Sequence, residues 1–392
     1  MEMKIKAELG KDTKEPSSVA CGCSGGSRSP RLILVSQPSA PLVRGPMPPW
    51  VVGKVVTPAG AISKVSTELS PSDHWEHVRC RISAFRNDYR VPPGLYAVGE
   101  PDRKSDVLVS ANYKLSFDAL RRELRRLNVW VLVLDTKGIN VWCAAGKGTF
   151  GTEELIRRIS LTRLDTIVDH RRLIVPQLGA PGVSGHKVSR ATGFRVLFGP
   201  VQARDIAAYI DAEYKATSDM RTIRFSLFDR LILTPMEMIP AMKKYPLYAV
   251  LVLGILGLQP SGIIFKDALA GGTPFLLLGL IAVLAGAFLT PLLLPVIPSR
   301  SFAVKGWLVG MLAVVLSLQS FTLLSTSLLV FACVFFPLVS SYIALQFTGA
   351  TTFTGMAGVK KELRFAIPVY LVFGVVSVML LIAFKLDQWG VL

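Results

Sequence analysis

One short segment of the chain combines a soft metal ligand with a backbone that a large ligand could approach. Residues 140–150 read Asn-Val-Trp-Cys-Ala-Ala-Gly-Lys-Gly-Thr-Phe. A cysteine thiolate is both a nucleophile and a metal ligand, and Lys147 or a nearby helix N-terminus would lower the pKa of Cys143 toward that form. The small residues 144–146 leave room for a bulky planar group beside the backbone. The same residues also fit a buried structural cysteine, so the spacing alone leaves both interpretations open.

A phosphate-binding loop is the first alternative for this segment, because Gly146-Lys147 follows a strand pattern and precedes a helix pattern. That loop requires glycine five positions before Gly146 and Ser or Thr directly after the lysine. The chain has Val141 and Gly148 at those positions. The sequence therefore argues against nucleotide hydrolysis here.

Two other groups of residues are of types that bind metals. Cys21 and Cys23 form a Cys-Gly-Cys pair, but two ligands do not complete a tetrahedral site. His74, His77 and Cys80 follow one another at intervals of three, yet on a helix such positions drift around the axis, and a fourth ligand is missing. We expect a solvated helix there rather than a zinc or mercury site. Five cysteines are also too few and too scattered for a disulfide framework.

The apolar pattern around the cysteine segment predicts strands that alternate with helices. Buried strands are predicted from short apolar runs at residues 107–110, 129–134 and 173–175. Helices are predicted from apolar spacing at residues 117–127, 152–159 and 203–212. The arginines of the first helix, Arg121 among them, are expected on its solvent side. This alternation predicts an α/β domain with a parallel, Rossmann-like sheet over residues 56–215.

Composition divides the chain into a basic front and an apolar rear. Hydrophobic residues make up 51% of the chain and the mean hydropathy is +0.46, which points to membrane spans. Seven of the 44 Lys and Arg residues lie beyond residue 245, so most of the net charge of +17 belongs to the front. A basic soluble part can bind nucleic acid, an anionic membrane or an acidic partner. The adjoining apolar part disfavours nucleic acid.

The rear part predicts five membrane spans. Stretches without a charged residue run over residues 245–265, 268–299, 306–359 and 365–384. One crossing needs about 20 residues, so the third stretch must hold two spans, with a turn near Thr322 to Ser327. The predicted all-α transmembrane domain covers residues 246–392, with spans at about 246–265, 275–297, 303–322, 327–347 and 365–385.

The remaining segments and the orientation follow from composition and charge. Residues 1–55 are rich in Ser, Gly and Pro and are expected to form a disordered leader. Residues 216–245 are expected to be a linker that lies on the membrane surface or forms a plain helix. No apolar signal segment opens the chain, so the front domain is expected in the cytosol. The basic loops then lie inside, which predicts a multi-pass protein of the cytoplasmic membrane with its C-terminus outside.

The cysteine segment resembles the signature of the mercury-methylation corrinoid protein family, HgcA. The family stretch Asn-(Val/Ile)-Trp-Cys-Ala-Ala-Gly-Lys is matched at all eight positions, Asn140 to Lys147. Residues 107–118 and 176–183 resemble segments of the large subunit of the corrinoid iron–sulfur protein of the acetyl-CoA pathway. That relative is soluble and lacks a cysteine at the position of Cys143. The resemblance covers about residues 85–215, and the membrane part by architecture only.

The resemblance implies a bound cobamide, with Cys143 on a capping helix as the lower axial ligand to cobalt and as the catalytic residue. The other cofactor-binding residues that it implies are Asn140, Val141, Trp142, Ala144, Ala145, Gly146, Lys147, Thr149, Gly179 and Gly182. The two later glycines would clasp the corrin edge or serve as ordinary turn glycines, and Trp142 would pack behind the cap more readily than stack. The cobalamin-binding pattern Asp-x-His-x-x-Gly is absent from the sequence, so another axial ligand or none is needed.

The resemblance also implies the reaction. A soft anionic sulfur on cobalt favours departure of a methyl group as a carbanion equivalent, for which Hg(II) is a suitable acceptor. The implied methyl donor is linked to methyltetrahydrofolate, and the implied partner is a small ferredoxin-like iron–sulfur protein (HgcB-type) that would suit the basic front. Membrane lipid is a further expected partner, and nucleic acid is not. Two alternatives are a corrinoid methyl carrier of one-carbon metabolism and a non-enzymatic membrane sensor or scaffold.

Overall fold

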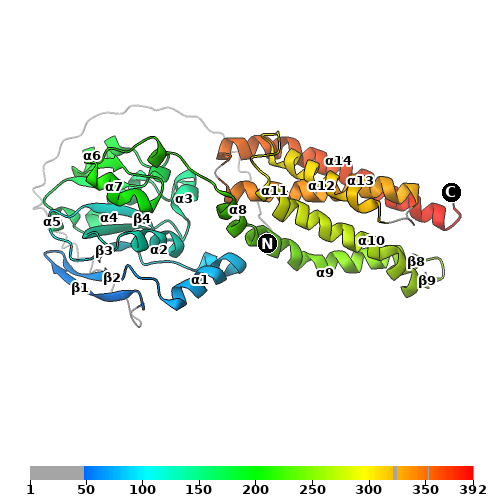
Figure 1. Cartoon of the computed structure of the whole chain (residues 1–392), viewed down its shortest axis with the longest axis horizontal. Coiled ribbons are helices and arrows are strands. Elements are labelled where there is room, and N and C mark those ends of the chain that lie inside the picture. The colour runs from blue at the N-terminus through cyan, green and yellow to red at the C-terminus, as the bar shows by residue number, and fades with distance from the viewer. Residues whose placement is uncertain (1–47, 321–324, 352, 392) are drawn as a thin grey trace, which may run out of the picture. The chain divides into compact units, whose positions relative to one another are not determined.

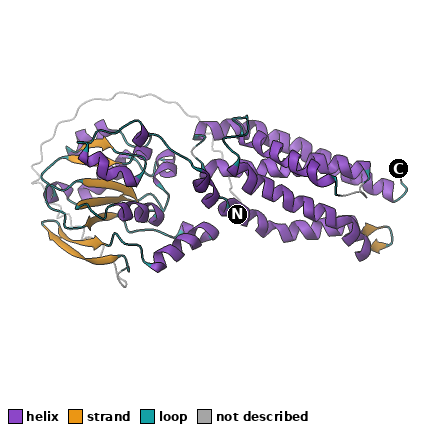
Figure 2. Cartoon of the chain, viewed as in Figure 1, coloured by secondary structure: helices purple, strands orange, loops and turns teal. Residues whose placement is uncertain are grey.

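The computed structural model describes residues 48–320, 325–351 and 353–391 (Figure 1). The first part of these residues forms a mixed β-sheet with helices on both faces. The second part consists of long apolar helices (Figure 2). The predicted leader over residues 1–55 lies mostly outside the described residues, and the first strand begins at Val51.

The sheet of the first part has seven strands in the order β1-β2-β3-β5-β4-β6-β7. They are β1 (Val51–Thr57), β2 (Gly60–Val65), β3 (Gly94–Val98), β4 (Val107–Ala111), β5 (Val129–Leu134), β6 (Arg172–Val175) and β7 (Arg195–Phe198). β5, β4, β6 and β7 run parallel, whereas β3 is antiparallel to β5 and β1 is antiparallel to β2. The three predicted strands are confirmed, but the sheet is mixed rather than wholly parallel.

The connection between β3 and β4 explains why the sheet is mixed. Only residues 99–106 separate these strands, and a parallel crossover needs a dozen or more residues. β3 therefore runs against the parallel strands. The parallel part is connected by helices: α2 (Lys114–Glu123), α3 (Val141–Lys147), α4 (Thr152–Leu161), α5 (Leu164–Ile167) and α6 (Gly185–Thr192), with α7 (Ile206–Asp211) after β7.

Alternate side chains of each strand point to opposite faces of the sheet, and each face has its own core. Val109 and Leu132 belong to the core that includes residues of α3, α4 and α6. Leu108 and Val131 belong to the core that includes residues of α2 and α7. Burial on both faces explains why these strands are continuous apolar runs in the sequence.

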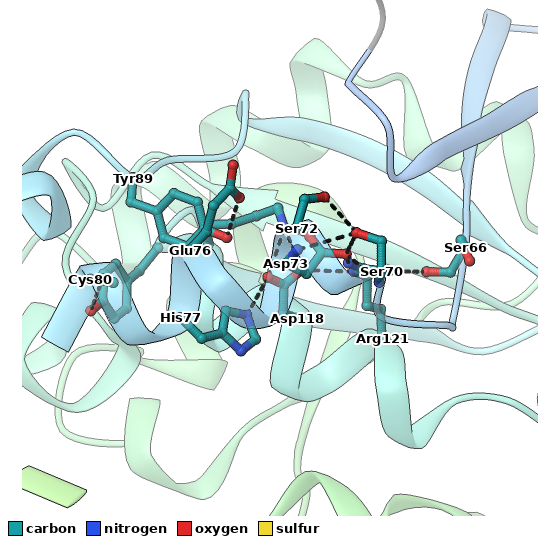
Figure 3. A network of polar contacts seen from close by, with 12 residues as sticks. Ser66, Ser70, Ser72, Asp73, Glu76, His77, Cys80, Tyr89, Asp118 and Arg121 are labelled. Carbon is teal, nitrogen blue, oxygen red and sulfur yellow. Dashed lines mark hydrogen bonds and ion pairs between the residues drawn. The ribbon is translucent and has the colours of Figure 1, made fainter.

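A buried network of charges joins α1 (Pro71–Ile82) to α2 (Figure 3). Lys114 Nζ lies 2.9 Å from Asp73 Oδ1 and 2.7 Å from both carboxylate oxygens of Asp118. The Arg121 guanidinium donates to Asp118 Oδ1 over 2.7 Å and to Asp73 Oδ2 over 2.8 Å. His77 Nε2 lies 2.8 Å from Asp118 Oδ2. The prediction that Arg121 lies in solvent is wrong, since its side chain is buried between two carboxylates.

Apolar helices make up the second part. They are α8 (Leu227–Leu233), α9 (Pro235–Gly257), α10 (Phe265–Leu284), α11 (Thr290–Leu292), α12 (Phe302–Leu318), α13 (Thr326–Gln346) and α14 (Met356–Gln388). A short hairpin of β8 (Leu258–Gln259) and β9 (Gly262–Ile263) separates α9 from α10, and a π-helical turn (Ala285–Leu289) joins α10 to α11. α8 and the start of α9 fall within the predicted linker, so helix begins before residue 246.

Four of the described helices are long and apolar enough to cross a membrane: Leu227–Gly257, Phe265–Leu292, Thr326–Gly349 and Ala357–Gln388. The remaining predicted span, at about 303–322, corresponds to α12, which is apolar but has only 17 residues. At a rise of about 1.5 Å per residue it is roughly 26 Å long, slightly less than the ~30 Å hydrocarbon core. The predicted turn at Thr322 to Ser327 lies partly outside the described residues.

The charge network predicts a large stability effect at Asp118. Asp118→Asn should lower the free energy of unfolding by about 3–5 kcal/mol, because Lys114 and Arg121 would stay buried without their full counter-charge. Asp211→Asn, at the exposed end of α7, is the matched control and should change the free energy by less than about 0.5 kcal/mol. Chemical denaturation of the full chain in detergent measures both. Equal stability of the two variants would contradict this account.

The same network predicts a loss of stability in acid. Burial raises the pKa of both carboxyls, but the bonds from Lys114 and the Ser70 backbone at Asp73, and from His77 and Lys114 at Asp118, outweigh it, so both pKa values lie below their ordinary range. A carboxyl whose pKa is depressed by folding stabilises the protein above its unfolded pKa, about 4, and loses that effect as pH falls. The free energy of unfolding should therefore fall between roughly pH 5 and pH 2, more steeply in the wild type than in Asp118→Asn.

Candidate functional site around Cys143

Cys143 lies in the first turn of α3, after the loop that follows β5. Asn140 is the N-cap of this helix, and its Oδ1 accepts a hydrogen bond of 2.9 Å from the backbone nitrogen of Cys143. The helix ends at Gly148, whose φ of 80° lies in the left-handed region that favours glycine. Asn140, expected from the resemblance as a cofactor-binding residue, thus caps the helix. Local sequence at both ends thus defines a seven-residue helix that carries the cysteine.

α3 has an inward and an outward face. Ala144 and Ala145 are buried and pack into the core on one face of the sheet. Cys143 is half-buried, while Gly146 and Lys147, three and four residues further on, are exposed. Residues at these intervals share a helix face. The thiol therefore lies on the outward face, with a glycine and an exposed lysine as its neighbours along that face.

Burial raises the pKa of the Cys143 thiol above its ordinary value, while the Asn140 hydrogen bond and the positive charge of Lys147 act in the opposite direction. The predicted lowering of this pKa is therefore wrong for the free thiol, although Lys147 acts in the predicted direction. Desolvation is the larger effect because the side chain is largely covered. A metal ion bound to the sulfur would displace the proton.

The loop that leads into α3 is held by Asn112, a buried residue directly after β4. Its Oδ1 accepts hydrogen bonds from the backbone nitrogen of Thr136 over 3.1 Å, the Thr136 hydroxyl over 2.9 Å and the backbone nitrogen of Gly138 over 2.9 Å. Sequence reasoning gave Asn112 no role. Its place at the carboxyl end of a predicted strand is the signal that could have found it.

Gly179 and Gly182, in the loop after β6, lie close against the α3 segment. A Cβ atom at Gly179 would come within 2.4 Å of the Phe150 ring. A Cβ atom at Gly182 would lie 2.1 Å from the carbonyl oxygen of Phe150 and 3.1 Å from Cα of Ala145. Thr152 adds a bond, since its backbone nitrogen donates to the carbonyl of Gly182 over 3.1 Å. The contacts of both glycines are thus packing contacts with the segment that carries Cys143.

The other predicted site residues lie along the same segment. Val141 packs against the core and Trp142 is half-buried. The Thr149 hydroxyl lies 3.5 Å from the carbonyl oxygen of Ala144, at the end of the helix. Lys147 is exposed. The structure therefore brings the predicted residues together around one short helix.

Among the residues that the structure describes, no group of three or more His, Cys, Asp or Glu could hold a metal ion. His77 contacts Asp118, and Cys80 Sγ lies 3.3 Å from the hydroxyl of Tyr113. The predicted helix over this run is confirmed, but Cys80 is buried rather than solvated. The Cys21-Gly22-Cys23 pair lies outside the described residues.

Residues 80–210 match the model of the family described as CO dehydrogenase/acetyl-CoA synthase delta subunit. The acetyl-CoA decarbonylase/synthase complex subunit gamma of Methanopyrus kandleri is 32% identical over 137 residues, which is 34% of this chain and 29% of that protein. The corrinoid/iron–sulfur protein large subunit of Moorella thermoacetica is 29% identical over 150 residues, 36% of this chain and 33% of that protein. The chain thus spans about a third or less of the length of these relatives. The matched region runs from α1 to α7 and includes the Cys143 segment.

The close approach at Gly182 predicts that even one added methyl group displaces α3. Gly182→Ala should lower the free energy of unfolding by about 1–3 kcal/mol, because the atoms it would meet are backbone atoms. It should also speed the alkylation of Cys143, measured peptide by peptide by mass spectrometry. Gly94→Ala, where an added Cβ meets nothing within 4 Å, is the control and should leave the alkylation rate unchanged. An unchanged rate in Gly182→Ala would show that this packing does not hold α3.

Proposed function

We propose that the chain is a membrane-bound, corrinoid-dependent methyltransferase that converts Hg(II) to methylmercury, with Cys143 as the axial sulfur ligand of cobalt. The position of Cys143 is the observation that carries the proposal. It is half-buried on the outward face of a short helix, after the end of a parallel strand, in a region similar to a corrinoid protein subunit. Open α/β sheets bind their ligands at this edge.

The residues at this edge fit a corrinoid. Cys143 offers one soft donor, which is enough where the cofactor brings four ring nitrogens of its own. The residues next to it on the outward face are Gly146, which has no side chain, and Lys147, which is exposed. When bound, a corrinoid supplies a cobalt centre that takes up a methyl group and passes it on. Cys143 would ligate the metal, and the exposed residues of α3 would lie beside the ring.

The chain's own residues then determine which acceptors are favoured. With a corrinoid bound, sulfur donation from Cys143 would favour acceptors that take a methyl group together with its electron pair, and Hg(II) is such an acceptor. The Cys143 proton must leave before the sulfur can bind cobalt, and Lys147 supports the thiolate that results. Asn140 holds the backbone of Cys143 by its cap. The α3 segment thus contains the proposed sulfur ligand (Cys143), the positive charge that favours its thiolate (Lys147) and the N-cap hydrogen bond that fixes the backbone of Cys143 (Asn140).

Partners and location complete the proposal. The α/β domain would lie in the cytosol, and α12 would be a fifth span beside the four longer helices in the cytoplasmic membrane, with the C-terminus outside. A methyltetrahydrofolate-linked donor would supply the methyl group. A small ferredoxin-like iron–sulfur protein would supply electrons, and the basic front of the chain would favour an acidic partner of this kind.

A corrinoid methyl carrier of one-carbon metabolism is the second candidate. It is favoured by the similarity to subunits of acetyl-CoA decarbonylase/synthase complexes. It gives no reason for a cysteine at position 143 or for the apolar helices, which lie beyond the matched region. The two candidates differ in the methyl acceptor, Hg(II) or a component of carbon metabolism.

Cys143→Ala should lower the rate of methylmercury formation by at least about a hundredfold while the chain still binds corrinoid. Removing the sulfur ligand takes away the electron donation but leaves the rest of the binding surface. The assay uses the full chain in nanodiscs with cobamide, a methyl donor, a low-potential reductant and Hg(II), and measures methylmercury by mass spectrometry and bound corrinoid by its visible spectrum.

Cys333→Ala, on α13, is the matched control and should methylate at the wild-type rate. Methylation of Hg(II) by Cys143→Ala at the wild-type rate would refute the proposal. Wild-type protein that holds corrinoid and passes methyl to a carbon-metabolism acceptor, but not to Hg(II), would establish the second candidate.

A further inference from the structure

The helical part contains a cavity of about 1640 Å³ that the proposed function does not use. Residues of α12, α13 and α14 line it, and α13 packs against both of the other helices. Its walls are mostly apolar and include Trp307 and Met311 of α12, Leu338 of α13, and Val369 and Phe373 of α14. We call this cavity the α12–α14 groove.

The depth of the groove matches one leaflet of a bilayer. Its lining on α12 runs from Phe302 to Met311, and a helix rises about 1.5 Å per residue, so this wall is roughly 14 Å long. Half of a hydrocarbon core of about 30 Å is close to this length. On α14 the lining runs from Gly358 to Phe373, and its apolar part, from Phe365 to Phe373, is roughly 12 Å long. An acyl chain of one leaflet would therefore lie along its whole length.

The end of the groove at the start of α12 carries positive charge. Arg300 and Lys361 line this end and are exposed. Neither takes part in an ion pair with any residue that the structure describes. The neighbouring carboxylate of Glu362 has other partners, since its Oε1 accepts bonds of 2.6 Å from the Ser301 hydroxyl and 2.7 Å from the backbone nitrogen of Ala303. Lys305 also lines the groove, but it is buried and its ammonium donates to the carbonyl oxygen of Leu294. Arg300 and Lys361 are thus the two exposed cations at the mouth of an apolar groove.

We propose that the α12–α14 groove binds an anionic phospholipid, with the headgroup phosphate at Arg300 and Lys361 and an acyl chain against α13. Basic pockets between membrane helices on the cytoplasmic side are typical sites for anionic headgroups. A purely apolar ligand would leave both cations unpaired, and a small soluble anion would leave the apolar walls uncovered. An amphiphile with a negative head matches both the apolar walls and the exposed cations. The assignment depends on these helices crossing a membrane, and it is independent of the reaction at Cys143.

The bound lipid would join two helices that the groove separates. α12 and α14 each pack on α13, and the lipid would fill the space between them. α12 is the short apolar helix of 17 residues, and a span shorter than the hydrocarbon core carries a cost of hydrophobic mismatch. A bound lipid that packs against α12 would reduce this cost. The expected consequence is a higher unfolding temperature in the presence of anionic lipid.

Native mass spectrometry of the full chain in a neutral detergent tests the charge requirement. Phosphatidylglycerol and phosphatidylcholine with the same acyl chains are added separately, and the wild type should bind the anionic lipid at least about tenfold more tightly. The double variant Arg300→Gln, Lys361→Gln should lose this preference. The control Lys266→Gln, Lys360→Gln removes the same charge from exposed positions outside the groove and should keep it. Equal binding of both lipids by the wild type, or an undiminished preference in the double variant, would overturn the proposal.

A second pair of variants tests the apolar walls without changing charge. Val369→Trp fills the groove from α14, whereas Leu371→Trp adds the same ring at an exposed position of α14 that does not line it. Val369→Trp should abolish both lipid binding and the rise in unfolding temperature, and Leu371→Trp should retain both. Unfolding temperatures without lipid show whether each variant is folded. Tight binding of phosphatidylglycerol by folded Val369→Trp would show that the lipid binds outside the groove. A lipid-free dimer as the dominant wild-type species would indicate that a second copy of the chain covers the groove. Either result would refute the assignment.

Discussion

A helix of seven residues cannot keep its place in water by its own hydrogen bonds, so the position of Cys143 depends on what packs behind α3. Ala144 and Ala145 enter the core of the sheet, and the loop after β6 comes so close that Gly182 has no room for a side chain. Asn112, at the end of β4, holds the loop before the helix. The thiol is thus placed by three segments that lie far apart in the sequence and meet at one edge of the sheet. Every chemical role proposed for Cys143 depends on this packing.

Features of the site that depend on neighbouring residues could be predicted from the sequence, and those that depend on distant residues could not. The cap at Asn140 and strands β4, β5 and β6 were predictable because caps and apolar runs are local signals. Arg121 occupies a polar position of its helix, yet it is buried because its guanidinium bonds to the carboxylate of Asp73. Asp73 lies 48 residues earlier in the sequence, so this contact is not a local signal. The pKa of Cys143 was misjudged for the same reason, since the nearby charge is visible in the sequence and the burial is not. The antiparallel β3 became apparent only through its short connection to β4.

The apolar half shows the same division between local and distant information. Charge-free stretches located the apolar helices, but they did not give the helix ends, because a helix such as α9 continues through Lys243 and Lys244 into the segment expected to be a linker. Hydropathy also could not show that α12 and α14 both pack on α13 and leave a groove between them. That groove depends on which helices are neighbours. The relatives offer no guide there, because the matched region ends at residue 210.

The central claim, a bond between the sulfur of Cys143 and cobalt, is tested most directly by X-ray absorption at the cobalt edge of the full chain loaded with cobamide. The account predicts one sulfur neighbour of cobalt in the wild type, and its replacement by a nitrogen or oxygen neighbour in Cys143→Ser. A wild-type spectrum that contains only nitrogen and oxygen neighbours would contradict the account, whatever the activity of the protein.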